Sequence, residues 1–183
     1  MNRNRPYGCK LTPEHAEIAR KIAEEGIVLL KYENHFFPIE KGRYQKIAVI
    51  GENAVKQLSL GGGSSELKPQ KEISPLEGMI EKYGKEHILF TLGYASGEPN
   101  YSNELPSGLD ADSLVQEALK VAREADVVLF FGGLNKNFQQ DCEGDDRRSM
   151  DLPFGQNELI EKIIQVNPNT GVILISGNAV SMQ

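Results

Sequence analysis

Four continuous apolar runs constrain the fold of this 183-residue chain more than any other feature of its sequence. They are "KIAVIG" (46–51), "HILFTLG" (87–93), "DVVLFFGG" (126–133) and "VILIS" (172–176). The centre of each run is apolar throughout, which is typical of a strand buried on both faces of a parallel sheet. Parallel strands cannot be joined by tight turns, so such a sheet requires a crossover segment, usually a helix, between its strands.

Segments with helical periodicity lie before and between these runs. In the first of them, Thr12 is a predicted N-cap, Pro13 stands at the first helical position and Gly26 closes the helix. The run "IVLL" (27–30) follows and is predicted to form a short buried strand or core segment. Further helices are predicted over residues 75–83, 110–125 and 155–166. This alternation of strands and amphipathic helices predicts an α/β fold.

Composition excludes several classes of function. The apolar share of 39% and the charged share of 25% are those of an ordinary folded domain. The formal net charge of -6 and the lack of a basic cluster weigh against a nucleic-acid partner, so a neutral substrate is expected. No stretch is apolar enough to span a membrane or to act as a signal segment. We expect a soluble chain, periplasmic or secreted if a leader precedes it and cytoplasmic otherwise.

Small and polar residues follow each predicted strand. They are "GEN" (51–53), "GY" (93–94), "GGLN" (132–135) and "SGN" (176–178). The carboxyl ends of parallel strands meet at one edge of the sheet, where ligands bind in such folds. A glycine-rich loop, "LGGGSS" (60–65), and an acidic loop, "QDCEGDDRRSMDLP" (140–153), follow the same edge. A site is therefore predicted there.

No metal or cofactor site is predicted. The glycine-rich loop lacks the lysine of a Walker loop and the spacing of a dinucleotide loop. The acidic loop begins like a calcium loop, but Asp146 stands where glycine is required and Leu152 where a bidentate glutamate is required. Cys9 and Cys142 match neither a zinc spacing nor a disulfide framework. The histidines, predicted to be structural or exposed, are His15, His35 and His87.

Glycosidic chemistry uses two carboxyl groups, one protonated to assist the leaving oxygen and one ionised to attack or to activate water. In the acidic loop, Glu143 precedes Gly144 and is expected to project from a turn. Neighbouring carboxylates would help to hold a proton on Glu143, which would raise its pKa. A solvated charge cluster is the open alternative; its members are Asp141, Glu143, Asp145, Asp146, Arg147 and Arg148.

The order of the sequence blocks resembles the second domain of family 3 glycoside hydrolases, the β-glucosidase group. The blocks are "HAEIARKIAEEGIVLLK", "IAVIGENA", "LGGGSSELKP", "SPLEGM", "GLNKNFQQDCEGDDRRSMDLPFGQNELIEKI" and "NPNTGVILISGNAVSM". The similarity covers about residues 12 to 182, and its most specific string is "EGDDRRSMDLPFGQ" (143–156).

The resemblance implies a retaining, exo-acting β-glycosidase without a cofactor. In that family an N-terminal (β/α)8 barrel supplies an aspartate nucleophile, and the second domain is a three-layer α/β/α sandwich with a mostly parallel sheet. By this resemblance Glu143 is the general acid/base, Asp146 and Arg147 shape its loop, and Ser64 and Ser65 contribute to substrate binding near the aglycone. The implied partners are a β-linked glucoside or oligosaccharide and the barrel.

The resemblance also implies a domain organisation. Residues 1–11 are expected to be an N-terminal extension or interdomain linker, and residues 12–183 a partial second domain that is truncated at its C-terminus. Because the chain lacks a barrel and its nucleophile, the isolated fragment is expected to be inactive.

One departure from the family pattern bears on the acid. Asp145 stands where relatives commonly carry an aromatic or small residue, which is expected to raise the pKa of Glu143 or to alter aglycone preference. Two alternatives stay open. One is a non-catalytic carbohydrate-binding or interdomain scaffold, and the other is an enzyme in which Asp141 or Asp145 replaces Glu143 as the acid.

Overall fold

The computed structural model describes residues 7–58, 64, 67, 69–98, 100, 102–103, 105–144 and 146–182. The chain divides into two compact units, Met1–Pro38 and Ile39–Gln183. The first unit contains helix α1 (Pro13–Gly26), whose N-cap Thr12 accepts a hydrogen bond at 3.3 Å from the backbone N–H of His15. The predicted first helix and its cap are confirmed.

The prediction of a buried strand or core segment at residues 27–30 is wrong. These residues belong to no strand, and their exposed fractions lie between 58% for Leu29 and 78% for Ile27. A strand requires a partner that satisfies its backbone groups. Within the described residues of the first unit, α1 is the one element of regular structure, so the unit itself supplies no such partner.

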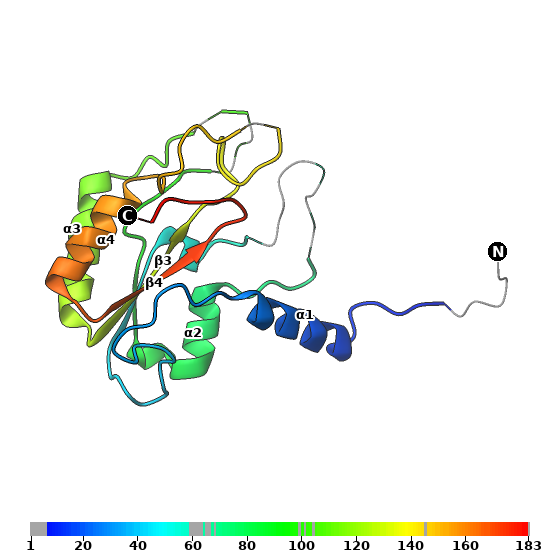
Figure 1. Cartoon of the computed structure of the whole chain (residues 1–183), viewed down its shortest axis with the longest axis horizontal. Helices are drawn as coiled ribbons and strands as arrows, with labels where there is room; N and C mark the ends of the chain where they lie inside the picture. The colour runs from blue at the N-terminus through cyan, green and yellow to red at the C-terminus, as the bar shows by residue number, and fades with distance from the viewer. Residues whose placement is uncertain are drawn as a thin grey trace. The chain divides into compact units, whose positions relative to one another are not determined.

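The second unit is built on a parallel sheet of four strands in the order β2-β1-β3-β4 (Figure 1). The strands are β1 (Ile47–Ile50), β2 (Ile88–Thr91), β3 (Val127–Gly133) and β4 (Thr170–Ile175). The two central strands, β1 and β3, are buried along their whole length. Each predicted run therefore forms a strand, and the predicted parallel pairing is confirmed.

Three α-helices cover the sheet. They are α2 (Pro75–Tyr83), α3 (Ala111–Glu124) and α4 (Gln156–Val166); the short 3-10 helices are η1 (Glu52–Ala54) and η3 (Lys85–His87). Figure 1 shows α3 and α4 side by side against one face of the sheet and α2 on its other side. The three-layer α/β/α sandwich is thus confirmed. Ser74 and Glu77 cap α2 reciprocally, because each side chain binds the backbone N–H of the other.

The main core lies between the sheet and the pair α3 and α4. It consists of Ala48, Ile50, Tyr94, Ala118, Leu119, Ala122, Val128, Phe130, Leu159 and Ile163. Full burial of a large apolar side chain contributes about 1.5–3 kcal/mol. This packing fixes the carboxyl ends of β1 and β3, from which the glycine-rich and acidic loops leave the sheet.

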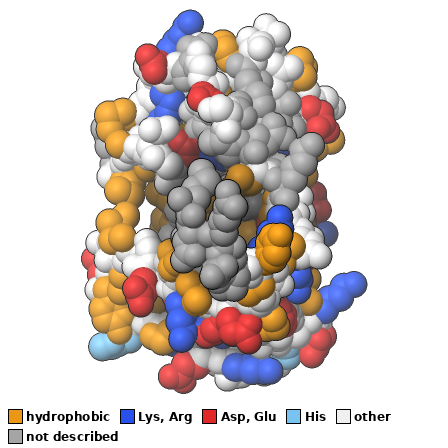
Figure 2. Space-filling view, turned by 90° about the vertical axis from the view of Figure 1, so that its right-hand side faces the viewer, with side chains coloured by type: hydrophobic (Ala, Val, Ile, Leu, Met, Phe, Trp, Pro, Cys, Tyr) orange, Lys and Arg blue, Asp and Glu red, His pale blue; other side chains and the backbone are white. Residues whose placement is uncertain are grey.

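The surface carries charges of both signs. On the face drawn in Figure 2, Lys, Arg, Asp and Glu side chains are interspersed among hydrophobic and neutral ones. Among the described residues, no helix is long and apolar enough to cross a membrane. Of the three histidines, His15 and His35 are exposed and His87 is partly buried.

Candidate active site

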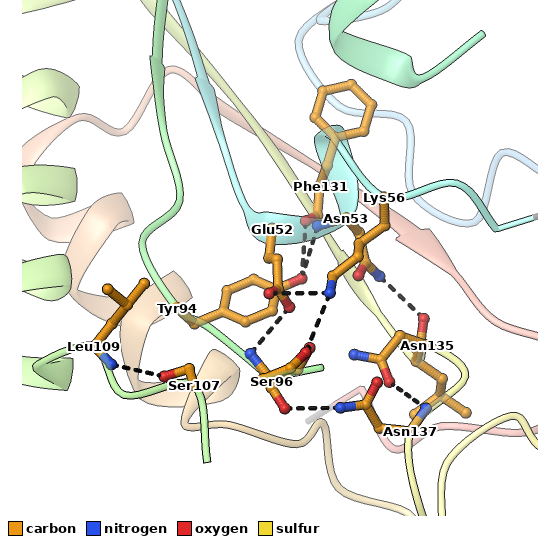
Figure 3. Close-up of polar contacts among 12 residues, drawn as sticks. Glu52, Asn53, Lys56, Tyr94, Ser96, Ser107, Leu109, Phe131, Asn135 and Asn137 are labelled. Carbon is orange, nitrogen blue, oxygen red and sulfur yellow. Dashed lines mark hydrogen bonds and ion pairs between the residues drawn. The ribbon is translucent and has the colours of Figure 1, made fainter. Parts of the chain in front are cut away.

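The carboxyl ends of the strands meet at one edge, as predicted. The side-chain amide of the buried Asn53, which follows β1, donates to the carbonyls of Gly132 at 3.0 Å and Leu134 at 3.1 Å. The hydroxyl of Tyr94, which follows β2, donates to the carbonyl of Phe131 at 3.2 Å. Figure 3 shows these side chains converging on the end of β3. Residues that follow β1 and β2 therefore fix the point at which the chain leaves β3.

Residues 134–155 connect β3 to α4, and we call them the β3–α4 loop. The two ends of this loop, at Gly133 and Gln156, are held together, and we call this part of the loop its neck. The fully buried amide of Gln156 accepts a hydrogen bond from the N–H of Gly133 at 2.8 Å and donates to its carbonyl at 2.9 Å. A Cβ at Gly132 would lie 2.4 Å from Oε1 of Gln156, so only glycine leaves room for this contact. The first residue of α4 thus pins the last residue of β3.

A second set of buried polar contacts supports the start of this loop (Figure 3). Glu52 forms an ion pair with Lys56 at 3.3 Å and accepts from the N–H of Ser96 at 3.1 Å. The side chain of Asn137 donates to the carbonyl of Ser96 at 2.7 Å. Because Glu52, Ser96 and Asn137 are all buried, these contacts fasten the loop to the segments that follow β1 and β2.

At the tip of the loop, Glu143 meets Ser64 of the glycine-rich loop. The hydroxyl of Ser64 donates to Oε1 of Glu143 at 2.7 Å, and the N–H of Ser64 donates to Oε2. These two donors, the hydroxyl first, hold the pKa of Glu143 below its ordinary value of 4.5. The two residues that the sequence placed at one edge of the sheet are therefore in contact.

The expectation that neighbouring acids raise the pKa of Glu143 is wrong for this structure. Hydrogen bonds from Ser64 stabilise the carboxylate, and Glu143 is exposed, so burial does little to oppose them. Gly144 adopts a positive φ of 100°, which agrees with the predicted turn. The structure thus presents Glu143 as an ionised group held by a serine.

The remaining predicted site residues have different surroundings. Arg147 donates to the carbonyl of Asp151 at 3.3 Å and to that of Ala179. Asp146 is exposed in the same loop. Ser65 and Asp145 lie outside the residues that the structure describes.

Two further features concern ligands. Among the described residues, no group of three or more His, Cys, Asp or Glu side chains is arranged to hold a metal ion. A surface depression of about 460 Å³ lies beside the β3–α4 loop, and Glu143 is absent from its lining in the described part of the chain. It is lined by Gln140, Cys142, Asp146, Arg147, Arg148, Ser149, Met150, Asn178 and Ala179.

Sequence reasoning missed the role of three side chains. Asn53 and Gln156 hold the neck of the β3–α4 loop, and Asn178 binds its acidic segment through Asp141. For the two asparagines a signal was present, because a glycine and then an asparagine stand at the carboxyl ends of β1 and β4 in "GEN" (51–53) and "SGN" (176–178); no such pattern marks Gln156. Asparagine after a buried strand has both a donor and an acceptor with which to bind the backbone of a neighbouring loop.

Comparison with known proteins identifies the family. Residues 27–183 match the glycosyl hydrolase family 3 C-terminal domain. A β-glucosidase of Bacteroides ovatus is 47% identical over 188 aligned residues, which cover 100% of this chain and 25% of that protein. An exo-alpha-(1->6)-L-arabinopyranosidase of Bifidobacterium longum is 34% identical, with 92% of this chain and 21% of that protein covered.

A solved structure agrees with the fold. A β-glucosidase from Kluyveromyces marxianus superposes with a TM-score of 0.81 and 23% identity, over 97% of this chain and 37% of that chain. The present chain spans about a quarter of the length of the Bacteroides ovatus relative. On the match over residues 27–183, the chain belongs to glycoside hydrolase family 3 and carries its C-terminal domain.

Proposed function

We propose that this chain is the acid/base-bearing part of a retaining, exo-acting β-glucosidase that hydrolyses terminal β-glycosidic bonds. The observation that carries the proposal is the position of Glu143, which contacts Ser64 at the carboxyl edge of the sheet. The 47% identity to a β-glucosidase supports a β-glucoside as substrate. The nucleophile would come from an N-terminal (β/α)8 barrel, the second partner in this proposal.

In the first step, the barrel aspartate attacks the anomeric carbon and the bond to the leaving oxygen breaks. Glu143 gives its proton to that oxygen, so the aglycone departs as a neutral alcohol. In the second step, the Glu143 carboxylate takes a proton from water, and the resulting hydroxide displaces the aspartate from the sugar. Each step inverts the anomeric carbon, so the product retains its configuration.

Ser64 suits the state of Glu143 between these steps. After it has donated its proton, Glu143 is a carboxylate, and the two Ser64 donors stabilise this form. For the first step the carboxyl group must be protonated. Contact with the substrate or the barrel would therefore have to replace the Ser64 hydrogen bonds or add a neighbour that favours the acid.

A second candidate function is a non-catalytic carbohydrate-binding or interdomain scaffold. The two hydrogen bonds from Ser64 favour it, because they stabilise the carboxylate of Glu143 and lower its pKa, whereas proton donation requires the acid form. The arrangement of loops would then present a sugar-binding surface without turnover.

The test is Glu143→Gln in the full-length protein that contains this chain. Two β-glucosides are compared, one with an activated phenol and one with a poor, alkyl leaving group. General acid catalysis contributes about 100- to 10,000-fold, so kcat/KM for the poor substrate should fall by at least that lower factor, while kcat/KM for the activated one, which reports the first step alone, falls far less. Equal, mild losses on both would remove Glu143 from the mechanism.

The matched control is Glu161→Gln, an exposed glutamate on α4. It should leave both rates unchanged, because it lies on a helix rather than in the β3–α4 loop. If the unsubstituted protein hydrolyses neither substrate, the scaffold function is favoured instead.

A further inference from the structure

We propose that Asp141 is a positioning residue, whose carboxylate anchors the segment that carries Glu143 to the turn after β4. This inference rests on the proposed function of Glu143 and goes beyond it, because it assigns a separate role to a second carboxylate. It also bears on the alternative that Asp141 is itself the acid.

Both carboxylate oxygens of Asp141 accept a hydrogen bond. Oδ2 accepts from the backbone N–H of Gly177, and Oδ1 accepts from the side-chain amide of Asn178 at 2.5 Å. The N–H of Asp141 itself donates to the carbonyl of Asn135 at 2.8 Å. Asp141 therefore joins the start of the β3–α4 loop to the turn that follows β4.

The fit of Asp141 against this turn is close. A Cβ at Gly177 would lie 2.8 Å from Oδ2 of Asp141, which is too short for a side chain to be accommodated without a shift. The absence of a side chain at Gly177 is what allows the carboxylate to reach the backbone. The turn "SGN" (176–178) is thus matched to the carboxylate in both shape and donors.

Two further hydrogen bonds join the segment after β4 to the β3–α4 loop. Arg147 donates to the carbonyl of Ala179, and the N–H of Ser181 donates to the carbonyl of Met150 at 2.7 Å. The segment that follows β4 therefore binds the β3–α4 loop on both sides of Glu143. Because Glu143 lies between Asp141 and Arg147, loss of either anchor would leave the acid/base group less constrained.

Each carboxylate oxygen of Asp141 accepts a hydrogen bond from the turn after β4, whereas the oxygens of Glu143 are bound by Ser64 of the glycine-rich loop. The two carboxylates therefore bind different parts of the fold, and the variants below separate their roles.

An exchange of Asp141 and Asn178 separates the two roles in the full-length protein. In Asn178→Asp, two carboxylates face each other, and a displacement of about 1 Å at the acid would lower the rate on the poor substrate about 100-fold. In Asp141→Asn, rotation of the Asn178 amide restores one hydrogen bond, so a loss of about threefold is expected. The double variant Asp141→Asn with Asn178→Asp restores a donor–acceptor pair and should recover to the level of Asp141→Asn.

The loss on the poor substrate relative to the loss on the activated one shows whether a variant displaces the acid. A variant that merely unfolds in part loses kcat/KM equally on both substrates, whereas a displaced acid lowers kcat/KM more on the poor one. If Asp141→Asn abolishes activity and the double variant is equally inactive, Asp141 is the acid and the proposal is wrong. If Asn178→Asp changes nothing, the anchor has no role.

A second measurement keeps the test independent of catalysis. Hydrogen exchange of the peptide over residues 176–182 should accelerate in Asp141→Ala and in Asn178→Asp, and should return to the original rate in the double exchange. If hydrogen exchange is unchanged in all variants, Asp141 does not anchor this segment, even if Glu143→Gln loses more activity on the poor substrate than on the activated one. If exchange accelerates in these variants but Glu143→Gln has no effect on activity, the anchor is supported and the proposed function is refuted.

Discussion

The β3–α4 loop is buried at its neck and exposed at its tip, and the two regions are held by different means. At the neck, the buried amides of Asn53 and Gln156 bind the end of β3 at distances of 2.8–3.1 Å. At the tip, Glu143 is exposed, and within the described part of the chain its carboxylate is bound by Ser64. The buried contacts fix where the loop starts and ends, whereas the contact at the tip is exposed to solvent.

A substitution at the neck should cause the largest loss in the free energy of unfolding. Gln156→Ala leaves both the N–H and the carbonyl of Gly133 without their partner in a buried site, which costs about 3 kcal/mol of the free energy of unfolding. Urea denaturation measures this loss. Gln165→Ala, an exposed glutamine on the same helix, is the matched control and should change stability by less than about 0.5 kcal/mol. Similar values for both would show that the neck is not fixed by Gln156.

The same contrast between buried and exposed positions separates two apolar runs of similar composition. Val49, in β1, is fully buried, whereas Val28 is 73% exposed. Val49→Ala should cost about 2 kcal/mol, because it removes buried methyl groups and leaves a cavity, while Val28→Ala should cost less than about 0.5 kcal/mol. Equal losses in urea denaturation would show that residues 27–30 are buried in solution.

These two runs also show how far sequence could predict the fold. The strands and helices of the second unit were predictable, because apolar runs and helical periodicity are local signals; α2, for example, spans the predicted residues 75–83. The run at 27–30 carries the same local signal as β1. Its exposure depends on whether a partner strand exists, and no local pattern contains that information.

The candidate site was predictable in part for a related reason. The parallel topology brings all strand ends to one edge, so the meeting of the glycine-rich and acidic loops followed from the strand assignment. The direction of the Glu143 pKa shift did not, because it depends on a hydrogen bond to Ser64, which is 79 positions away in sequence. The anchor between Asp141 and Asn178, 37 positions apart, is equally invisible to a local pattern.

A substitution at the tip should change the free energy of unfolding least, but it should clearly change the titration of Glu143. Ser64→Ala removes the hydroxyl that contributes most to the lowered pKa of Glu143, so this pKa should rise towards 4.5. The stabilisation from this contact is present at neutral pH and is lost as the pH falls through the lowered pKa, because protonation removes the charge that Ser64 binds. Carboxyl NMR titration of Glu143 measures the shift.

Ser64→Ala also bears on the reaction. If Glu143 is the acid, as proposed, it must be protonated in the first step, and a higher pKa for Glu143 would move the alkaline limb of the pH profile of kcat/KM to higher pH. A profile that stays in place while the Glu143 pKa rises would indicate that this limb reports another group. An unchanged Glu143 pKa would mean that the Ser64 contact does not form in solution.

The most direct test of the central claim is the product that Glu143→Gln forms from an activated β-glucoside when azide is added. Azide needs no general base, so it can attack the glycosyl-enzyme that water attacks slowly without Glu143. If Glu143 is the acid/base residue, turnover rises with azide and the product is the β-glycosyl azide, which retains the configuration of the substrate. Unchanged turnover and no glycosyl azide would contradict the assignment of Glu143 as the acid/base residue.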